Sequence, residues 1–167
     1  MKTSLGRLSL LLIVLTTIGC DHATKYVART SLQGEPNRSY FGNVVRIGYA
    51  ENTGGFLSLG ADLPSAPRTV LFTAITGLVL AGLAVLVFRG KLDRVTGTGM
   101  ALFIAGGISN WIDRVLQGRV VDFLNVGIGS LRTGIFNVAD VAIMIGAAIM
   151  VFGELGKSRR PTVTTPT

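Results

Sequence analysis

The stretch Asn110–Asp140 reads NWIDRVLQGRVVDFLNVGIGSLRTGIFNVAD, and it lies between two long apolar runs of the chain. It holds three of the nine acidic residues, namely Asp113, Asp122 and Asp140. An Asp at the centre of a membrane helix costs about 2.5–3.5 kcal/mol on insertion scales. Because acids so close to hydrocarbon are expensive, we expect them to have a function and the remaining chain to form a membrane frame that holds them at one water–lipid boundary.

The overall composition indicates a membrane protein. Hydrophobic residues make up 49% of the 167 residues, and the mean hydropathy is +0.54. Long apolar runs with few charges are typical of membrane spans rather than of a soluble domain. This length allows one membrane domain, residues 1–167, with about four helices and modest connections.

The positive charge is concentrated in short flanks of the apolar runs. The net charge is +7, and half of the 16 Lys and Arg residues lie in these flanks: Lys2, Arg7, Arg89, Lys91, Arg94, Lys157, Arg159 and Arg160. Such a bias is typical of cytoplasmic loops. It predicts that both termini are cytoplasmic, and it argues against nucleic acid as a partner.

Four apolar runs predict transmembrane helices at about residues 8–27, 69–88, 95–112 and 138–155. The connections 30–68 and 114–137 then face outward. The segment Tyr40–Tyr49 contains NVVRIGY, which favours strands over a helix. The sequence therefore predicts an all-α membrane protein with a small extracytoplasmic β-sheet at about 30–68, a second outward-facing loop at 114–137, and a disordered tail at 157–167.

The first apolar run has two interpretations. Leu8–Cys20 follows a basic start and ends in Thr-Ile-Gly-Cys, which is similar to a signal peptide with the lipidation site of a bacterial lipoprotein. We favour an uncleaved first span, because three more spans follow and because Asp21 and Lys25, four residues apart, can pair on one helix face. The alternative, a polytopic protein that is itself a lipoprotein modified at Cys20, stays open.

Cysteine and histidine are scarce. Cys20 and His22 are the single residues of their kinds, so no internal disulfide and no metal site of the usual ligand types is predicted. A site made only of carboxylates stays open. We expect no cofactor.

Polar residues converge on one boundary of the predicted bundle. Asn110, Asp113 and Arg114 share a face at the end of the third span, and Asp140 lies at the start of the fourth. Asp122 lies in the apolar run VVDFL. Two close carboxylates cannot both ionise cheaply, so one keeps a proton while the other acts as a base on water. Asp122 and Asp140 are therefore candidates for a catalytic dyad, whereas a helix cap, a helix-end ion pair or a cation or proton carrier are the alternatives.

Four motifs in order along the chain resemble lipoprotein signal peptidase (signal peptidase II), an aspartyl protease family of the bacterial inner membrane. They are DHATK at 21–25, NTGGF at 52–56, GGISNWIDR at 106–114 with Gly118 and VVDF at 120–123, and FNVAD at 136–140. The resemblance implies that Asp122 and Asp140 are the catalytic pair. It also implies that further residues line or support the site, namely Asn52, Gly54, Asn110, Asp113, Arg114, Asn137 and Ala139, and that Asp21 and Lys25 hold the first helix in place.

The same resemblance implies a substrate and a location. The substrate is a prolipoprotein whose Cys carries diacylglycerol, cut on the N-terminal side of that Cys near the outer membrane surface. Membrane lipid and a cyclic peptide inhibitor of the globomycin type are implied partners. The chain departs from the family's usual pattern at His22, at Ser109, and in a second motif that is one small residue shorter before Phe56.

Overall fold

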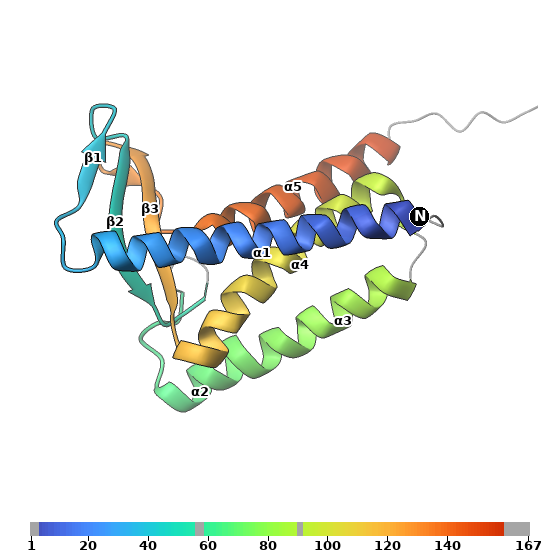
Figure 1. The fold of residues 1–167 in the computed structure, drawn as a ribbon, viewed down its shortest axis with the longest axis horizontal. Helices are drawn as coiled ribbons and strands as arrows, with labels where there is room; N and C mark the ends of the chain where they lie inside the picture. The colour runs from blue at the N-terminus through green and yellow to red at the C-terminus, as the bar shows by residue number, and fades with distance from the viewer. Residues whose placement is uncertain (1–3, 56–58, 90–91, 159–167) are drawn as a thin grey trace, which may run out of the picture.

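The computed structural model describes residues 4–55, 59–89 and 92–158. Its long helices run side by side, and a small β-sheet lies across one end of them (Figure 1). The helices are α1 (Ser4–Leu32), α2 (Ser65–Thr69), α3 (Thr76–Arg89), α4 (Arg94–Gln117) and α5 (Val138–Ser158), and a π-helical segment, Val70–Ile75, joins α2 to α3. Strands β1 (Arg38–Tyr40), β2 (Val45–Asn52), β3 (Val120–Ile128) and β4 (Leu131–Arg132) form the sheet.

Four helical stretches have the length and apolar composition of membrane spans: Leu8–Leu32, Ser65–Arg89, Arg94–Gln117 and Val138–Lys157. This confirms the predicted number of spans. Helix α4 is the central one, because it packs against α1, α3 and α5. Small residues allow the close approach: Ala101 and Ala105 are buried in α4, and a side chain at Gly77 of α3 would collide with the indole of Trp111.

The sheet has the order β1-β2-β3-β4, with every neighbouring pair antiparallel. Strand β2 pairs with β3 from Val45 opposite Val126 to Asn52 opposite Val120. The connection predicted as a separate outward loop is therefore part of the sheet. The backbone of β2 needs a partner on its free edge, and VVDFLNV supplies a β-branched, half-buried strand for it.

The helices extend beyond the apolar runs. Helix α1 continues through Cys20 without a break to Leu32, so the first connection begins later than predicted, and only residues 38–40 and 45–52 of it form strands. Helix α5 continues to Ser158, so the predicted disorder does not begin at 157. The rest of the predicted tail, 159–167, and Phe56 of the second motif lie outside the described residues.

Capping interactions set the ends of α4. Asp93 accepts hydrogen bonds from the backbone N–H groups of Val95 and Thr96 at its start. Gly118 ends the helix with a φ of 70°, a left-handed conformation that glycine adopts without strain. This sharp end directs the chain into β3 only two residues later, and it brings Asp122 back over the end of the bundle.

Candidate active site

Asp122 lies on β3 with its side chain directed to the buried end of the helices, and only 2% of the residue is exposed. Its Oδ2 accepts a hydrogen bond from Nδ2 of Asn52 at 2.9 Å, and its Oδ1 accepts one from Nδ2 of Asn137 at 2.6 Å. Burial raises the pKa of Asp122 to about 6, and the nearby charge of Asp140 acts in the same direction. Asp122 therefore holds its proton at a pH where an exposed Asp has lost it.

Asp140 belongs to a capping box at the start of α5. Oδ1 of Asn137 accepts a hydrogen bond from the backbone N–H of Asp140 at 2.9 Å, and Oδ2 of Asp140 accepts one from the backbone N–H of Asn137 at 3.1 Å. The helix dipole at this end favours a negative charge. The cap proposed as an alternative role for Asp140 is thus present, and it fixes the carboxylate beside Asp122, because both acids bind the same Asn137.

Three asparagines donate to the two carboxylates, and each amide has its direction fixed by another group. Gly54 N–H donates to Oδ1 of Asn52, and the backbone of Asp140 does the same for Asn137. For Asn110, Oδ1 accepts from Nζ of Lys25 at 2.8 Å, so its Nδ2 is free to donate to Oδ1 of Asp140 at 2.9 Å. Each of the four carboxylate oxygens therefore receives one N–H donor.

Behind this pair lies a buried ionic network that joins α1 to α4 and α5. Nζ of Lys25 lies 2.6 Å from Oδ2 of Asp21 and 2.7 Å from Oδ2 of Asp113. Asp21 also accepts hydrogen bonds from Oγ of Ser109 at 2.7 Å and from the backbone N–H of Ala139 at 2.8 Å. The Asp21–Lys25 pair predicted from the spacing is confirmed, and it fixes α1 against the beginning of α5.

A tight turn after β2 covers the site from the side. The carbonyl oxygen of Gly54 accepts hydrogen bonds from Nε and Nη2 of Arg114, at 3.1 and 2.5 Å. Gly55 packs against the ring of Phe72 so closely that a side chain there would overlap it. The guanidinium of Arg114 lies 6.0 Å from the centre of the same ring. Arg114 therefore holds this turn over the end of α4 rather than pairing with Asp113.

The structure brings together every residue that the sequence analysis placed in the site. They are Asp122, Asp140, Asn52, Gly54, Asn110, Asp113, Arg114, Asn137, Ala139, Asp21 and Lys25. Ser109 is a buried member that we had noted only as a departure from the family pattern, and its spacing of four residues from Asp113 was the one available signal. Among residues 4–55, 59–89 and 92–158, no group of three or more His, Cys, Asp or Glu side chains could hold a metal ion.

Comparison with known proteins gives consistent results over most of the chain. The family model described as signal peptidase II matches residues 13–155. A lipoprotein signal peptidase of Psychromonas ingrahamii is 34% identical over 150 residues, which cover 89% of this chain and 86% of the relative. One of Streptococcus pneumoniae is 35% identical and covers 86% of this chain and 90% of the relative.

Solved structures agree with this fold. A bacterial membrane enzyme structure obtained by the in meso method at 2.3 Å resolution superposes with a TM-score of 0.80 and 25% identity, covering 95% of this chain and 94% of that one. A second, at 1.9 Å resolution, gives a TM-score of 0.74 and 26% identity over 88% of this chain and 92% of that one.

Proposed function

Because the chain belongs to the signal peptidase II family and is a multi-pass membrane protease, we propose that it is an aspartyl endopeptidase that matures lipoproteins. Its substrates are prolipoproteins with a Cys that carries diacylglycerol. The enzyme cuts the peptide bond on the N-terminal side of that Cys and so releases the signal peptide.

The observation that carries this proposal is the pairing of Asp122 with Asp140 through one shared asparagine. Asn137 donates to both carboxylates, from its side chain and from its backbone. The two acids come from different elements, β3 and α5, and both are nearly fully buried. Two carboxylates held close together in a buried site can share one proton, which supports the assignment of this pair as the catalytic dyad.

The mechanism follows from the different surroundings of the two acids. Asp122, in its buried setting, keeps the proton, and Asp140, at the N-terminus of α5, is the ionised base. Asp140 takes a proton from a water molecule, whose oxygen attacks the peptide carbonyl, while Asp122 gives its proton to the carbonyl oxygen. Asp140 then returns its proton to the leaving amine as the C–N bond breaks, and the new carboxylic acid restores a proton to the pair.

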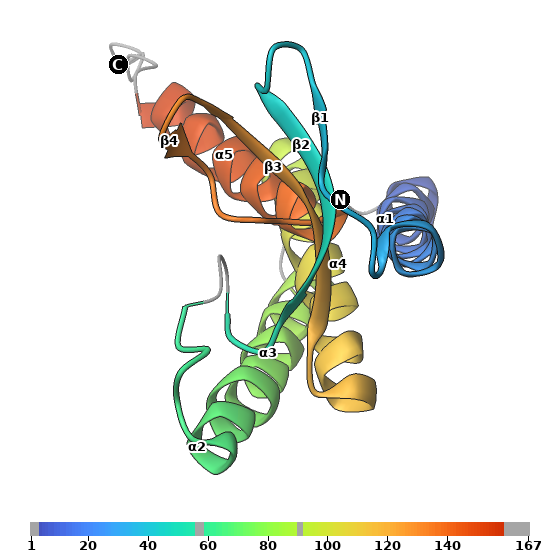
Figure 2. The ribbon, with the colours of Figure 1, turned by 90° about the vertical axis from the view of Figure 1, so that its left-hand side faces the viewer.

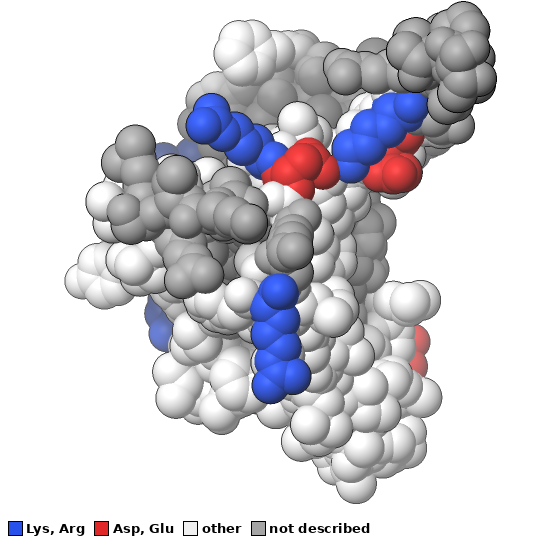
Figure 3. Space-filling view, turned by 90° about the vertical axis from the view of Figure 1, so that its right-hand side faces the viewer, with Lys and Arg blue, Asp and Glu red and all other residues white. Residues whose placement is uncertain are grey.

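The charge distribution supports an orientation with the site outward. The end of the bundle opposite the sheet carries Lys and Arg side chains with a few acids between them (Figure 3). Arg89 ends α3, Arg94 begins α4 and Lys157 is in the last turn of α5. By the positive-inside rule this end is cytoplasmic. The dyad then lies near the outer surface of the inner membrane, at the depth of a Cys whose acyl chains remain in the bilayer, and a globomycin-type cyclic peptide is expected to inhibit there.

The test is cleavage of a diacylated prolipoprotein by the purified protein in detergent or lipid. Wild type should release a product that begins at the lipidated Cys. Asp122→Asn and Asp140→Asn should each lower the rate by about 10²–10⁴-fold or more, because each removes a proton-transfer group. Asp62→Asn is the matched control, since Asp62 is exposed and has no place in the site.

Each variant is compared with wild type in its thermal unfolding, so that loss of fold is separated from loss of chemistry. Cleavage by both folded dyad variants would show that the dyad is assigned to the wrong residues. If wild type cuts none of the prolipoproteins offered, the proposed substrate class is wrong.

A further inference from the structure

Two hairpin turns lie side by side where the strands of the sheet end. The turn between β1 and β2, at residues 41–44, is joined to the end of β3 by a hydrogen bond from the backbone N–H of Gly127 to the carbonyl of Val44 at 2.9 Å. Arg132 of β4 donates to the carbonyls of Asn43 and Val44, at 2.7 and 3.2 Å. The two turns therefore form one surface, which we call the tip surface and define by Phe41, Arg46, Ile128, Leu131 and Arg132.

The large apolar residues of the tip surface are strongly exposed. Leu131 is 85% exposed, Phe41 82% and Ile128 77%. These values match those of residues on the membrane spans that face outward from the bundle, such as Leu78 at 75% and Phe88 at 79%. Apolar side chains clustered and presented to this extent indicate a partner surface.

Phe41 is held outward by an unusual backbone. Its φ is 54°, and that of Asn43 in the same turn is 71°. A bulky residue in the left-handed region is uncommon, and such a conformation costs about 1–2 kcal/mol. The turn keeps an aromatic ring at its first residue at the expense of stability, which indicates a function for that ring.

The charge of the two hairpins has one sign. Residues 36–47 and 124–135 include Arg38, Arg46 and Arg132 and no Asp or Glu. Nε of Arg46 donates to Oδ1 of Asn43 at 2.7 Å, which places this cation at the turn that carries Phe41. Apolar side chains flanked by cations are the pattern by which proteins bind the interface of a membrane.

The strands run across the end of the bundle rather than along it. Seen from the sheet end, the β1–β2 hairpin projects beyond the outline of the helices (Figure 2). Because the helices span the bilayer, a hairpin that overhangs them at this level lies above the surrounding lipid. We propose that the tip surface binds the outer interfacial layer of the bilayer, with Phe41, Ile128 and Leu131 at the boundary of headgroups and acyl chains and the arginines at lipid phosphates.

This contact gives the active site a depth reference. Asp122 and Ile128 lie on the same strand, six residues apart, which corresponds to about 20 Å of extended chain. The remaining strand is fixed to the helices at its other end by the contacts of Asp122. Because this attachment is rigid, lipid bound at the tip sets the tilt of the whole helix bundle in the bilayer, and with it the height of Asp122 relative to the lipidated Cys. This consequence rests on the proposed function, whereas the lipid contact does not.

The contact is tested by spin labels in vesicles of phosphatidylcholine and phosphatidylglycerol. The single cysteine, Cys20, is exposed, so a Cys20→Ala background allows labels at Phe41→Cys and Leu131→Cys. Glu35→Cys, in the exposed turn after α1, is the aqueous reference, and Leu15→Cys, 58% exposed on α1, is the bilayer reference. Both tip labels should collide with oxygen more, and with a water-soluble nickel chelate less, than the label at 35. Collisions equal to those at 35 would overturn the proposal, as would protection from both reagents, since that marks a protein partner instead.

The functional consequence is tested with Phe41→Ser combined with Leu131→Ser. Misplacement of a reacting group by about 1 Å costs up to about 100-fold in rate, so we expect a loss of roughly 3–30-fold in vesicles and none in detergent without phospholipid. Equal loss in both media, or none in either, would refute the depth role. A wild type that cleaves nothing contradicts the proposed function alone, because the label measurement still decides the lipid contact.

Discussion

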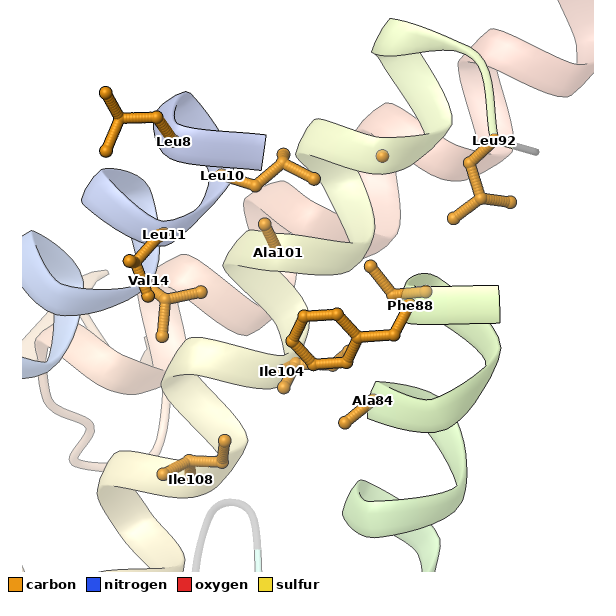
Figure 4. A pocket seen from close by; sticks show the side chains of 12 residues that line it. Leu8, Leu10, Leu11, Val14, Ala84, Phe88, Leu92, Ala101, Ile104 and Ile108 are labelled. Carbon is orange, nitrogen blue, oxygen red and sulfur yellow. The ribbon is translucent and has the colours of Figure 1, made fainter. Parts of the chain in front are cut away.

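The two ends of the helix bundle differ in where their polar and charged side chains lie. At the sheet end, nine polar or charged residues are buried, and none of the buried side-chain N and O atoms in the described part of the chain lacks a hydrogen-bond partner. At the opposite end, α1, α3 and α4 line an apolar groove of about 530 Å³ with side chains such as Leu11, Ala84 and Ile104 (Figure 4). Charged groups there lie on the surface, and among them Asp93 and Lys157 pair at 2.7 Å.

This difference shows at which end of the bundle the chain buries charged groups, despite the free energy that their burial costs. An unpaired charge inside a protein costs several kcal/mol, so a buried network is kept only when each member is satisfied. At the sheet end each member is satisfied, and the network leads to the two acids of the dyad. At the other end, the ion pair is solvated and fastens α4 to α5 without burial. Under the proposed function, the first end carries out the chemistry and the second sets the orientation in the membrane.

The largest expected effect comes from Lys25→Met. This change leaves Asp21 and Asp113 buried without their shared cation, so it should destabilise the protein by about 3–5 kcal/mol. It also releases the amide of Asn110 and should abolish cleavage. Thermal unfolding in detergent and prolipoprotein cleavage measure the two effects.

Lys157→Met is the matched control for this change, because it removes an exposed cation with two acidic partners. It should leave the unfolding temperature and the cleavage rate nearly unchanged. An equal loss of stability and of cleavage in the two variants would mean that the buried and the exposed ion pairs contribute alike, against the difference described between the two ends.

A second test uses the pH dependence of stability. Burial raises the pKa of Asp122 from 3.8 to about 6, so folding favours its protonated form. The contribution of Asp122 is fully present below pH 3.8 and is lost as the pH rises through 6. Between pH 4 and pH 8, wild type should therefore lose up to about 3 kcal/mol of stability relative to Asp122→Asn.

Unfolding temperatures of both proteins across this range give the comparison. Asp62→Asn, at an exposed position, should follow wild type at each pH. Parallel curves for wild type and Asp122→Asn would contradict the raised pKa.

Helix contacts next to the site supply a third, smaller effect. A Cβ added at Gly106 of α4 would overlap the backbone carbonyl of Ala139, which cannot move because α5 begins there. Gly106→Ala should cost about 1–3 kcal/mol through overpacking. At Gly82 of α3 a Cβ meets nothing within 4 Å, so Gly82→Ala should preserve or slightly raise stability. Unfolding of the two variants in the same detergent decides whether the tight packing is local to the site.

Part of this architecture could be predicted from the sequence because it depends on local patterns. The positions of the spans follow from the lengths of the apolar runs. The shared helix face of Asn110, Asp113 and Arg114 follows from their spacing. The proposed dyad of Asp122 and Asp140 was predicted from acids next to apolar runs and from the family resemblance, and the structure places the two acids together through Asn137. Asn137 and Asp140 were recognised as neighbours on one helix end, where the structure places a capping box.

The remaining features depend on contacts between distant segments. The pairing of β2 with β3 joins residues 68 to 81 positions apart, and no periodicity in either segment indicates which partner it takes. Ser109 was missed because its partner, Asp21, lies on another helix 88 residues away. Whether Arg114 binds Asp113 or the carbonyl of Gly54 likewise depends on the turn that the sheet brings over it.

The smallest expected effect is at the opposite end of the bundle. Asp93 accepts hydrogen bonds from Lys157 and from the first turn of α4, and these contacts, that of Lys157 above all, hold the pKa of its exposed carboxyl well below the usual range. Asp93→Ala removes the helix cap and should lower the unfolding temperature by roughly 2–4 °C. Asp93→Asn keeps an N-cap acceptor, so it should restore most of that loss.

Cleavage in detergent should equal that of wild type in both variants, because the cap is at the other side of the bilayer from the dyad. A strong loss of cleavage in Asp93→Ala at unchanged stability would show that the two ends are coupled through α4, and the division between a chemical end and an orienting end would no longer hold.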